Sequence, residues 1–226
     1  MALLVYVDDI IQARNDTRAC QDFKAYLHSC FHIKDLGPLK YFLGIEVARG
    51  PLGLFWCQRK SALEIVDECS LFGGKPIDFP MEENHKLALA IGRSLDDPGS
   101  YRRLVGRLIY LTITRPELCY VIHRLSQFMQ NPKEEHMHAA RRVLRYLKAT
   151  PGKGILLRAD NNLQVHAYCD TDWGACPLTR RSLTGYLVTL GGSSVSWWTK
   201  KQMTVSRSLP RLSTDLWQLV LVNWCG

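Results

Sequence analysis

Two kinds of hydrophobic pattern follow one another along the chain: short apolar runs bounded by turn residues, and longer stretches with helical spacing. The first run, residues 3–7, resumes at residues 10–11 and predicts a β-hairpin whose turn is formed by Asp8 and Asp9. Because the run is almost wholly apolar, it is typical of a strand buried on both faces. Residues 41–57 predict a second hairpin around a Gly-Pro turn.

Helical spacing predicts a helix over residues 17–31 and another from Ser61 to the glycine pair at 73–74. Residues 75–99 are rich in Pro, Asp, Glu and Gly, and have the composition of a surface connection. Two long helical stretches follow, the first interrupted at Pro116 and resuming over 121–129. Their apolar stripes predict a core of Tyr101, Leu104, Val105, Leu108, Leu111, Met137, Ala140, Leu144 and Leu147.

After Pro151-Gly152 the pattern changes to short strands separated by Asn-rich and Gly-rich turns. This change predicts a second, β-rich domain. The predicted strands are residues 154–158, 163–169, 185–190 and 194–198.

Composition narrows the class of protein. With 226 residues, 46% of them hydrophobic and 22% charged, the chain is globular rather than disordered or fibrous. The eight cysteines are scattered without a Cys-x-x-Cys motif or zinc-ligand spacing, which favours reduced thiols and an intracellular location, cytoplasmic or nuclear. The N-terminal apolar run is too short to cross a membrane, so no membrane partner is expected.

Charge points to a polyanionic partner. The net charge is +8 and the pI is about 9.1, which favours nucleic acid, although a generic basic protein has the same composition. Arg141, Arg145 and Lys148 form a basic stripe beside the apolar face of the last helix. Such a stripe is either a solvated helix face or a surface that follows a nucleic-acid backbone.

Asp8 and Asp9 are the first candidates for chemistry. Two adjacent carboxylates within an apolar hairpin are costly unless a cation or a tight turn compensates them. An isolated Asp-Asp is more often an ordinary turn, but Tyr-Val-Asp-Asp between two hydrophobic runs is more specific.

Together with this motif, blocks along residues 3–208 resemble the C-terminal part of the Pol polyprotein of copia-type LTR retrotransposons, where reverse transcriptase runs into ribonuclease H. The blocks occur in the family order, which makes chance similarity improbable. They are residues 6–10, 34–37, 40–46, 101–111, 114–116, 125–129, 142–148, 168–173, 179–186 and 200–202.

The resemblance implies an α+β fold with three parts. Residues 1–82 would be a partial reverse-transcriptase palm, and residues 83–150 a helical thumb or connection region. Residues 151–208 would be a truncated ribonuclease H-like, β-rich domain. Residues 209–226 are expected to be an out-of-frame tail.

The resemblance also implies roles for individual residues. Asp8 and Asp9 would be palm carboxylates that bind Mg²⁺ for nucleotidyl transfer on a template-primer of RNA and DNA. Asp170 would be the first catalytic, metal-binding aspartate of ribonuclease H, whereas neighbouring Asp172 is given a structural role. Lys34 or Lys40 would assist the leaving pyrophosphate, with a plain surface lysine as the alternative for each.

Two departures from the family pattern lead us to expect that the chain is inactive alone. The family's further palm aspartate lies earlier than Met1 allows, so Mg²⁺ held by Asp8 and Asp9 alone should bind weakly. Past Ser208, a one-base shift of the reading frame would restore the family's Ala-Glu-Ala-Glu-Tyr-Arg segment, so the later ribonuclease H carboxylates are expected to be lost. The alternatives are a non-catalytic, basic nucleic-acid-binding remnant and a decayed relic without function.

Overall fold

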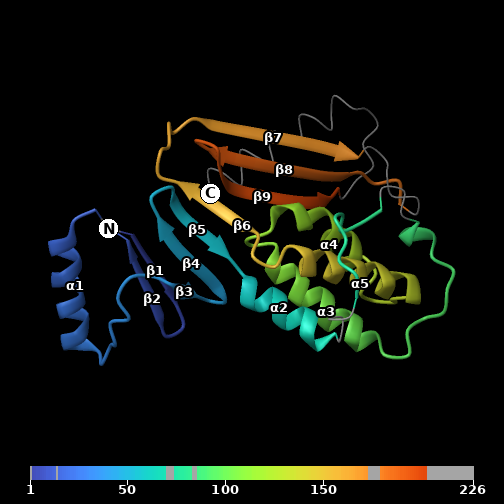
Figure 1. Ribbon diagram of the computed structural model, residues 1–226, viewed down its shortest axis with the longest axis horizontal. Coiled ribbons are helices and arrows are strands. Elements are labelled where there is room, and N and C mark those ends of the chain that lie inside the picture. Colours follow the sequence, from blue (N-terminus) through green and yellow to red (C-terminus); the bar gives the residue numbers. More distant parts are fainter. Residues whose placement is uncertain (1, 14, 70–73, 83–85, 173–178, 203–226) are drawn as a thin grey trace. The chain divides into compact units, whose positions relative to one another are not determined.

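The computed structural model describes residues 2–13, 15–69, 74–82, 86–172 and 179–202. Within them the chain forms five α-helices, two short 3-10 helices and nine strands (Figure 1), which confirms the predicted α+β class. The chain divides into two compact units, residues 1–42 and 43–226. The predicted boundaries at 82/83 and 150/151 both fall inside the second unit and stay predictions.

The first unit contains a hairpin and a helix. β1 (Ala2–Tyr6) pairs antiparallel with β2 (Asp9–Ala13), and α1 (Thr17–Cys30) follows before the short β3 (Tyr41–Phe42). α1 begins where predicted because the Asp16 side chain accepts a hydrogen bond from the backbone N–H of Ala19 at 3.2 Å.

Two details of the predicted hairpin were wrong. The two-residue turn is Val7-Asp8, with Val7 at a φ of 49°, and Asp9 already opens β2 opposite Tyr6. The strands are not buried on both faces either, since Leu4 and Val5 are 55% and 62% exposed. Among the described residues β1 and β2 pair only with each other, so an apolar run here does not imply burial.

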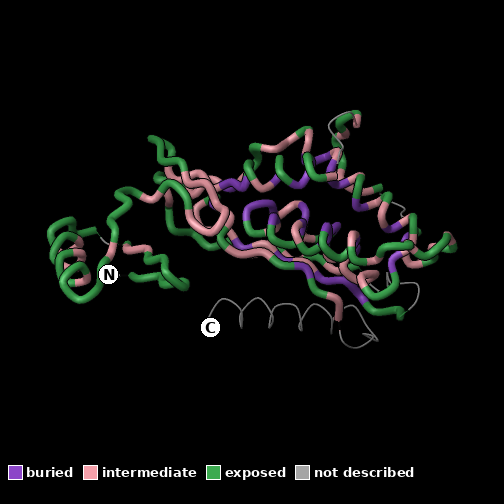
Figure 2. Tube along the Cα trace, turned by 90° about the horizontal axis from the view of Figure 1, so that it is seen from below, coloured by how far each residue is buried: buried purple, intermediate pink, exposed green. Residues whose placement is uncertain are grey.

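Four helices of the second unit build its core: α2 (Arg59–Glu68), α3 (Pro98–Leu111), α4 (Cys119–Ser126) and α5 (Glu134–Ala149). Two 3-10 turns, η1 (Leu87–Leu89) and η2 (Pro116–Leu118), precede α3 and α4. Figure 2 shows most buried positions on these helices. All the predicted core residues of the long helices are buried except Met137, which packs partly buried against the same cluster.

The second hairpin, β4 (Ile45–Gly50) and β5 (Gly53–Cys57), gains a third strand from far along the chain. β6 (Gly154–Arg158) pairs antiparallel with β5, placing Ile155 opposite Trp56. β6 was predicted as a strand, and this is confirmed. It extends the hairpin sheet, however, rather than the sheet of the later strands.

The remaining strands form a separate antiparallel sheet in the order β7 (Val165–Asp172), β8 (Leu183–Leu190), β9 (Ser193–Lys201). Asp170 lies opposite Gly185, which in turn lies opposite Thr199. The sheet is tied to the helices, because the indole N–H of Trp197 donates to the Thr112 carbonyl at 2.8 Å and Lys201 Nζ donates to Gln127 at 3.1 Å. Among the described residues no helix is long and apolar enough to cross a membrane.

Candidate functional site

Asp8 and Asp9 lie side by side on the exposed end of the first hairpin. Asp8 occupies the second turn position, and Asp9 is fixed by its antiparallel pairing with Tyr6. Within the described part of the chain, no hydrogen bond or ion pair is found at either carboxylate. The two groups therefore remain open to a cation from solvent.

The chemistry of this pair fits Mg²⁺. Magnesium prefers hard oxygen ligands, keeps several waters, and is commonly bound by one or two protein carboxylates together with phosphate oxygens. Asp8 and Asp9 provide such oxygens, but among the described residues no group of three or more His, Cys, Asp or Glu side chains is placed to hold a metal. The hairpin supplies part of a site, and water, phosphate or other protein groups would have to complete it.

Asp170 lies on a different element and in the second unit. It is exposed on β7, and its carboxylate accepts a hydrogen bond from the Thr171 backbone N–H at 2.8 Å. Among the described residues, Asp170 belongs to no group of three or more His, Cys, Asp or Glu side chains that could hold a metal. Asp170 is thus an exposed acidic group, and Asp172 lies two residues further along the same strand.

Asp172 has two partners on α4. Its Oδ2 accepts from the Tyr120 hydroxyl at 3.3 Å and lies 3.6 Å from Nη2 of Arg124. Arg124 also donates from Nε to the Tyr120 oxygen at 3.2 Å. These contacts link β7 to α4 and are consistent with the structural role expected for Asp172.

The basic stripe on α5 is partly engaged within the protein. Arg145 Nε donates to the Lys75 carbonyl at 2.7 Å, and Lys148 Nζ donates to the Gly74 carbonyl at 2.9 Å. Both cations therefore hold the segment that follows α2, while Arg141 is exposed. Lys34 and Lys40 are exposed residues of the first unit.

A surface on α3 was missed by the sequence analysis. Arg103, Gly106, Arg107 and Tyr110 follow one another at helical spacing on its outer side, and we refer to them as the α3 surface. A Cβ built at Gly106 would meet nothing within 4 Å, so no neighbouring group of the protein requires glycine there. A glycine inside a strongly periodic helix, on its polar side, was the available signal.

The fold and the hairpin define an α+β protein with two adjacent carboxylates at the end of a hairpin, and comparison with known proteins identifies the class. The family model described as reverse transcriptase (RNA-dependent DNA polymerase) matches residues 1–83. The retrovirus-related Pol polyprotein from transposon RE1 of Arabidopsis thaliana is 45% identical over 91% of the chain. The corresponding polyprotein from transposon TNT 1-94 of Nicotiana tabacum is 30% identical over 91% of it.

The chain spans 14% of the length of the RE1 polyprotein and 16% of the TNT 1-94 polyprotein. It also matches an uncharacterized mitochondrial protein of Arabidopsis thaliana at 39% identity, covering 92% of this chain and 86% of that protein. No solved structure matches. The chain therefore belongs to the reverse-transcriptase family of copia-type, retrovirus-related Pol polyproteins, and is a reverse-transcriptase-like fragment of such a polyprotein.

Proposed function

We propose that this chain carries the metal-binding hairpin of an RNA-directed DNA polymerase. The observation that carries the proposal is the exposed end of the first hairpin, where Asp8 and Asp9 lie side by side and form no ion pair with any other described residue. Residues 1–83, which include this turn, match the reverse-transcriptase family. Divalent metal bound there would neutralise charge on the α-phosphate as a primer 3′-hydroxyl attacks it.

The contribution of the chain to such a reaction is electrostatic and positional. Asp8 and Asp9 present oxygens from adjacent residues, and the β1–β2 pairing holds the backbone that carries them. Two ligands alone bind Mg²⁺ weakly, so we expect the isolated chain to bind the ion at millimolar rather than micromolar concentration. For the same reason we expect no primer extension by the isolated chain.

Paramagnetic broadening by Mn²⁺ tests the hairpin directly. In ¹H–¹⁵N spectra, backbone signals of residues 6–10 should broaden first, and Asp8→Asn with Asp9→Asn should abolish the effect. Asp22→Asn, at an exposed position of α1, is the matched control and should leave it unchanged. Broadening that persists after the Asp8 and Asp9 substitutions would contradict metal binding at this hairpin.

Primer extension with Mg²⁺ or Mn²⁺ tests the expected inactivity. Template-dependent extension by the purified chain, lost in Asp8→Asn, would show that two carboxylates suffice and would overturn the expectation. A ribonuclease H-like role is proposed for β7–β9, with Asp170 as one metal ligand. Because no group of three or more candidate metal ligands includes Asp170 among the described residues, hybrid RNA cleavage by this chain alone is not expected.

A second proposed function is nucleic-acid binding at the α3 surface. Glycine in a helix interior costs about 0.5–1 kcal/mol relative to alanine, and Gly106 does not relieve any close contact. Because Gly106 has no side chain, a binding partner can approach the helix backbone closely at this position. Arg103 and Arg107 beside it provide positive charge, and Tyr110 provides an aromatic face.

The chemistry of that partner is set by these neighbours. Arg107 is ion-paired with Glu68, whereas Arg103 is exposed, so Arg103 is the stronger candidate for a phosphate contact. Tyr110, whose hydroxyl donates to the Leu43 carbonyl, is held in place, and the residue as a whole is 41% exposed. An oriented aromatic ring beside a cation is typical of surfaces that bind nucleic acid through backbone charge and base stacking.

Filter binding of an oligonucleotide duplex and a single strand tests both basic surfaces. We expect Arg103→Gln to weaken binding and reduce its salt dependence more than Arg141→Gln on α5. Gly106→Leu should weaken binding by blocking close approach, whereas His138→Leu, at an exposed position of α5, is the control. Affinity that does not fall with added salt, or that is unchanged in Gly106→Leu, would defeat the proposal.

A further inference from the structure

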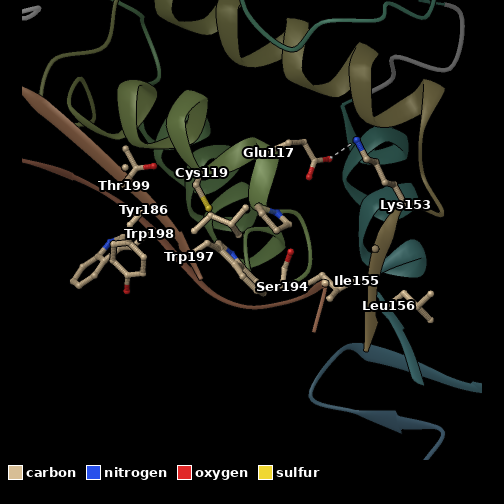
Figure 3. Close-up of a pocket in the computed structure, with 15 residues that line it drawn as sticks. Glu117, Cys119, Lys153, Ile155, Leu156, Tyr186, Ser194, Trp197, Trp198 and Thr199 are labelled. Carbon is tan, nitrogen blue, oxygen red and sulfur yellow. Dashed lines mark ion pairs between the residues drawn. The ribbon is translucent and has the colours of Figure 1, made fainter. Parts of the chain in front are cut away.

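A cavity of about 590 Å³ lies within the second unit, between η2, β6 and the β8–β9 side of the later sheet (Figure 3). Its size is that of pockets that take small organic ligands. None of the residues assigned to the hairpin, to β7 or to the α3 surface lines it. The proposed functions therefore leave this cavity unused.

One side of the cavity is a fixed aromatic wall. The Trp197 ring is held by the hydrogen bond from its indole N–H to the Thr112 carbonyl, at 2.8 Å. On the neighbouring strand β8, Gly185 contributes no side chain to the cavity. A Cβ built there meets nothing closer than 3.8 Å. An indole whose orientation is set by a hydrogen bond, beside open space, suits a flat, apolar ligand body, because little side-chain freedom is lost on binding.

The other side of the cavity is charged. Figure 3 shows Lys153 and Glu117 joined by an ion pair, and the Nζ to Oε1 distance is 3.5 Å. The same Glu117 oxygen accepts from Arg115 Nε at 2.6 Å. Two cations share one carboxylate, so the cluster carries a net charge of +1 and favours an anionic ligand group.

Lys153 is the group of this cluster that is able to reach a ligand. Arg115 is buried, whereas the Lys153 side chain is 50% exposed. Burial alone would lower the pKa of Lys153, but the hydrogen bond to Tyr146 and the charge of Glu117 raise it above its ordinary value. Lys153 therefore stays protonated at neutral pH and is available as the cation.

We propose that this cavity binds a small ligand with a flat aromatic body and a single anionic group. The aromatic body packs against Trp197 in the space left by Gly185, and the anionic group meets Lys153. A nucleoside monophosphate and a free aromatic acid share this chemistry.

Covalent chemistry is not part of the proposal. Cys119 also lines the cavity, but burial raises the pKa of its thiol to about 11, so it is protonated at neutral pH. A protonated thiol is a poor nucleophile. The site therefore holds its ligand by packing and charge.

Titration of the full chain with 2-naphthoate and adenosine 5′-monophosphate tests the proposal, with 2-naphthol and adenosine as the neutral counterparts. Binding is followed at the Trp197 indole N–H in ¹H–¹⁵N spectra. We expect saturable binding of at least one anion, with a dissociation constant of about 0.1–1 mM for a ligand of this size. The anion that binds more tightly shows whether the cavity prefers a nucleoside monophosphate or a free aromatic acid.

Three variants separate this site from general adsorption. Lys153→Gln should weaken anion binding by about two- to fivefold, as for a partly exposed charge pair, and leave the neutral counterpart unchanged. Gly185→Val should abolish binding of both the anion and its neutral counterpart, because the valine side chain would occupy the cavity. Lys60→Gln, an exposed lysine on α2, should change neither.

The proposal is overturned if neither anion binds saturably. It is also overturned if binding is unchanged in both Lys153→Gln and Gly185→Val. If Gly185→Val fails to fold, the comparison of anion with neutral compound in Lys153→Gln decides the matter. Equal losses for both compounds in that variant would exclude an anion contact.

Discussion

Asp172 on β7 lies 3.6 Å from Arg124 on α4, and this ion pair connects the later sheet to the helical core. The two partners differ in burial, since the Arg124 side chain is 9% exposed and that of Asp172 is 44% exposed. Arg124 also lies over the Tyr120 ring at 5.3 Å. Asp172 is thus the counterion of an almost buried guanidinium.

Removing this counterion should destabilise the protein. We expect Asp172→Asn to lower the free energy of unfolding by about 1–2 kcal/mol, less than for a fully buried pair because Asp172 is partly solvated. Urea unfolding followed by far-UV circular dichroism measures the effect. Asp170→Asn is the matched control on the same strand, and is expected to stay within about 0.5 kcal/mol of the parent. Equal losses in the two variants would argue against the special role of Asp172.

Arg115 has a similar but more buried position. Its guanidinium donates to Glu117 and to both the carbonyl and the hydroxyl of Thr150, at 2.6–2.8 Å. We expect Arg115→Met to destabilise the protein by about 3 kcal/mol or more, because several partly buried polar groups lose their buried partner at once. Thermal unfolding measures this loss.

Arg158→Met provides the comparison for Arg115. Arg158 also pairs with an acidic residue, Asp160, but both side chains are substantially exposed. Its removal should therefore cost less than about 1 kcal/mol. If both arginine variants lost the same amount, burial would not be what makes the Arg115 contacts strong.

The helices and most strands were predictable because their side chains repeat with the period of the element. The apolar stripe from Tyr101 to Leu111 faces one core, so spacing alone places it. The same logic failed for the first hairpin, where Leu4 and Val5 are apolar yet exposed. An apolar run indicates a tendency to be buried, but it does not indicate which other part of a protein would cover it.

Candidate chemistry was predictable only where a motif is local. Asp8 and Asp9 are neighbours in sequence, so their shared position at the turn end follows from the pattern. The use of Arg145 and Lys148 to hold Lys75 and Gly74 was not predictable, because those carbonyls lie about seventy residues earlier in the chain. The pairing of β6 with β5 was missed for the same reason.

His136 should make stability depend on pH. Its Nδ1 accepts from the Lys133 backbone N–H and its Nε2 lies 2.9 Å from the Leu87 carbonyl, while the ring stacks on Phe128. Burial lowers the pKa of His136 below its ordinary value of 6.5. The hydrogen bond to the Leu87 carbonyl and the charge of Glu135 oppose this lowering, and the charge of Lys133 adds to it. Protonation would place a hydrogen on Nδ1, which could then no longer accept from Lys133.

The direction of the effect follows from this lowered pKa. The unfolded chain takes up the proton first, so the stability due to neutral His136 is present above about pH 6.5 and is lost as pH falls through the lower folded-state pKa. The free energy of unfolding should fall between pH 7 and 5, and His136→Gln should flatten the slope. His138→Gln, an exposed position two residues on, should keep the parent slope. An unchanged slope in His136→Gln would assign the dependence elsewhere, with His123, whose pKa burial also lowers, as the next group to substitute.

Gly106 and Gly44 make opposite predictions for the same substitution. Gly44 has a φ of 76°, and a Cβ there would lie 3.3 Å from the Tyr110 ring, so Gly44→Ala should destabilise the protein. Gly106 is helical and faces open space, so Gly106→Ala should raise the free energy of unfolding by about 0.5–1 kcal/mol. Chemical denaturation of the two variants measures both effects.

A stabilised Gly106→Ala variant would mean that the natural residue reduces stability at an exposed site. The presence of glycine at this position is then explained by binding rather than by folding. The binding proposed above is the close approach of nucleic acid to α3. Gly106→Ala and Gly106→Leu should bind oligonucleotides progressively more weakly while both fold at least as well as the parent. Should stability rise and binding remain at the parent level in both, glycine at this position would serve neither the fold nor the nucleic-acid surface, and that surface would have to be sought on α5 instead.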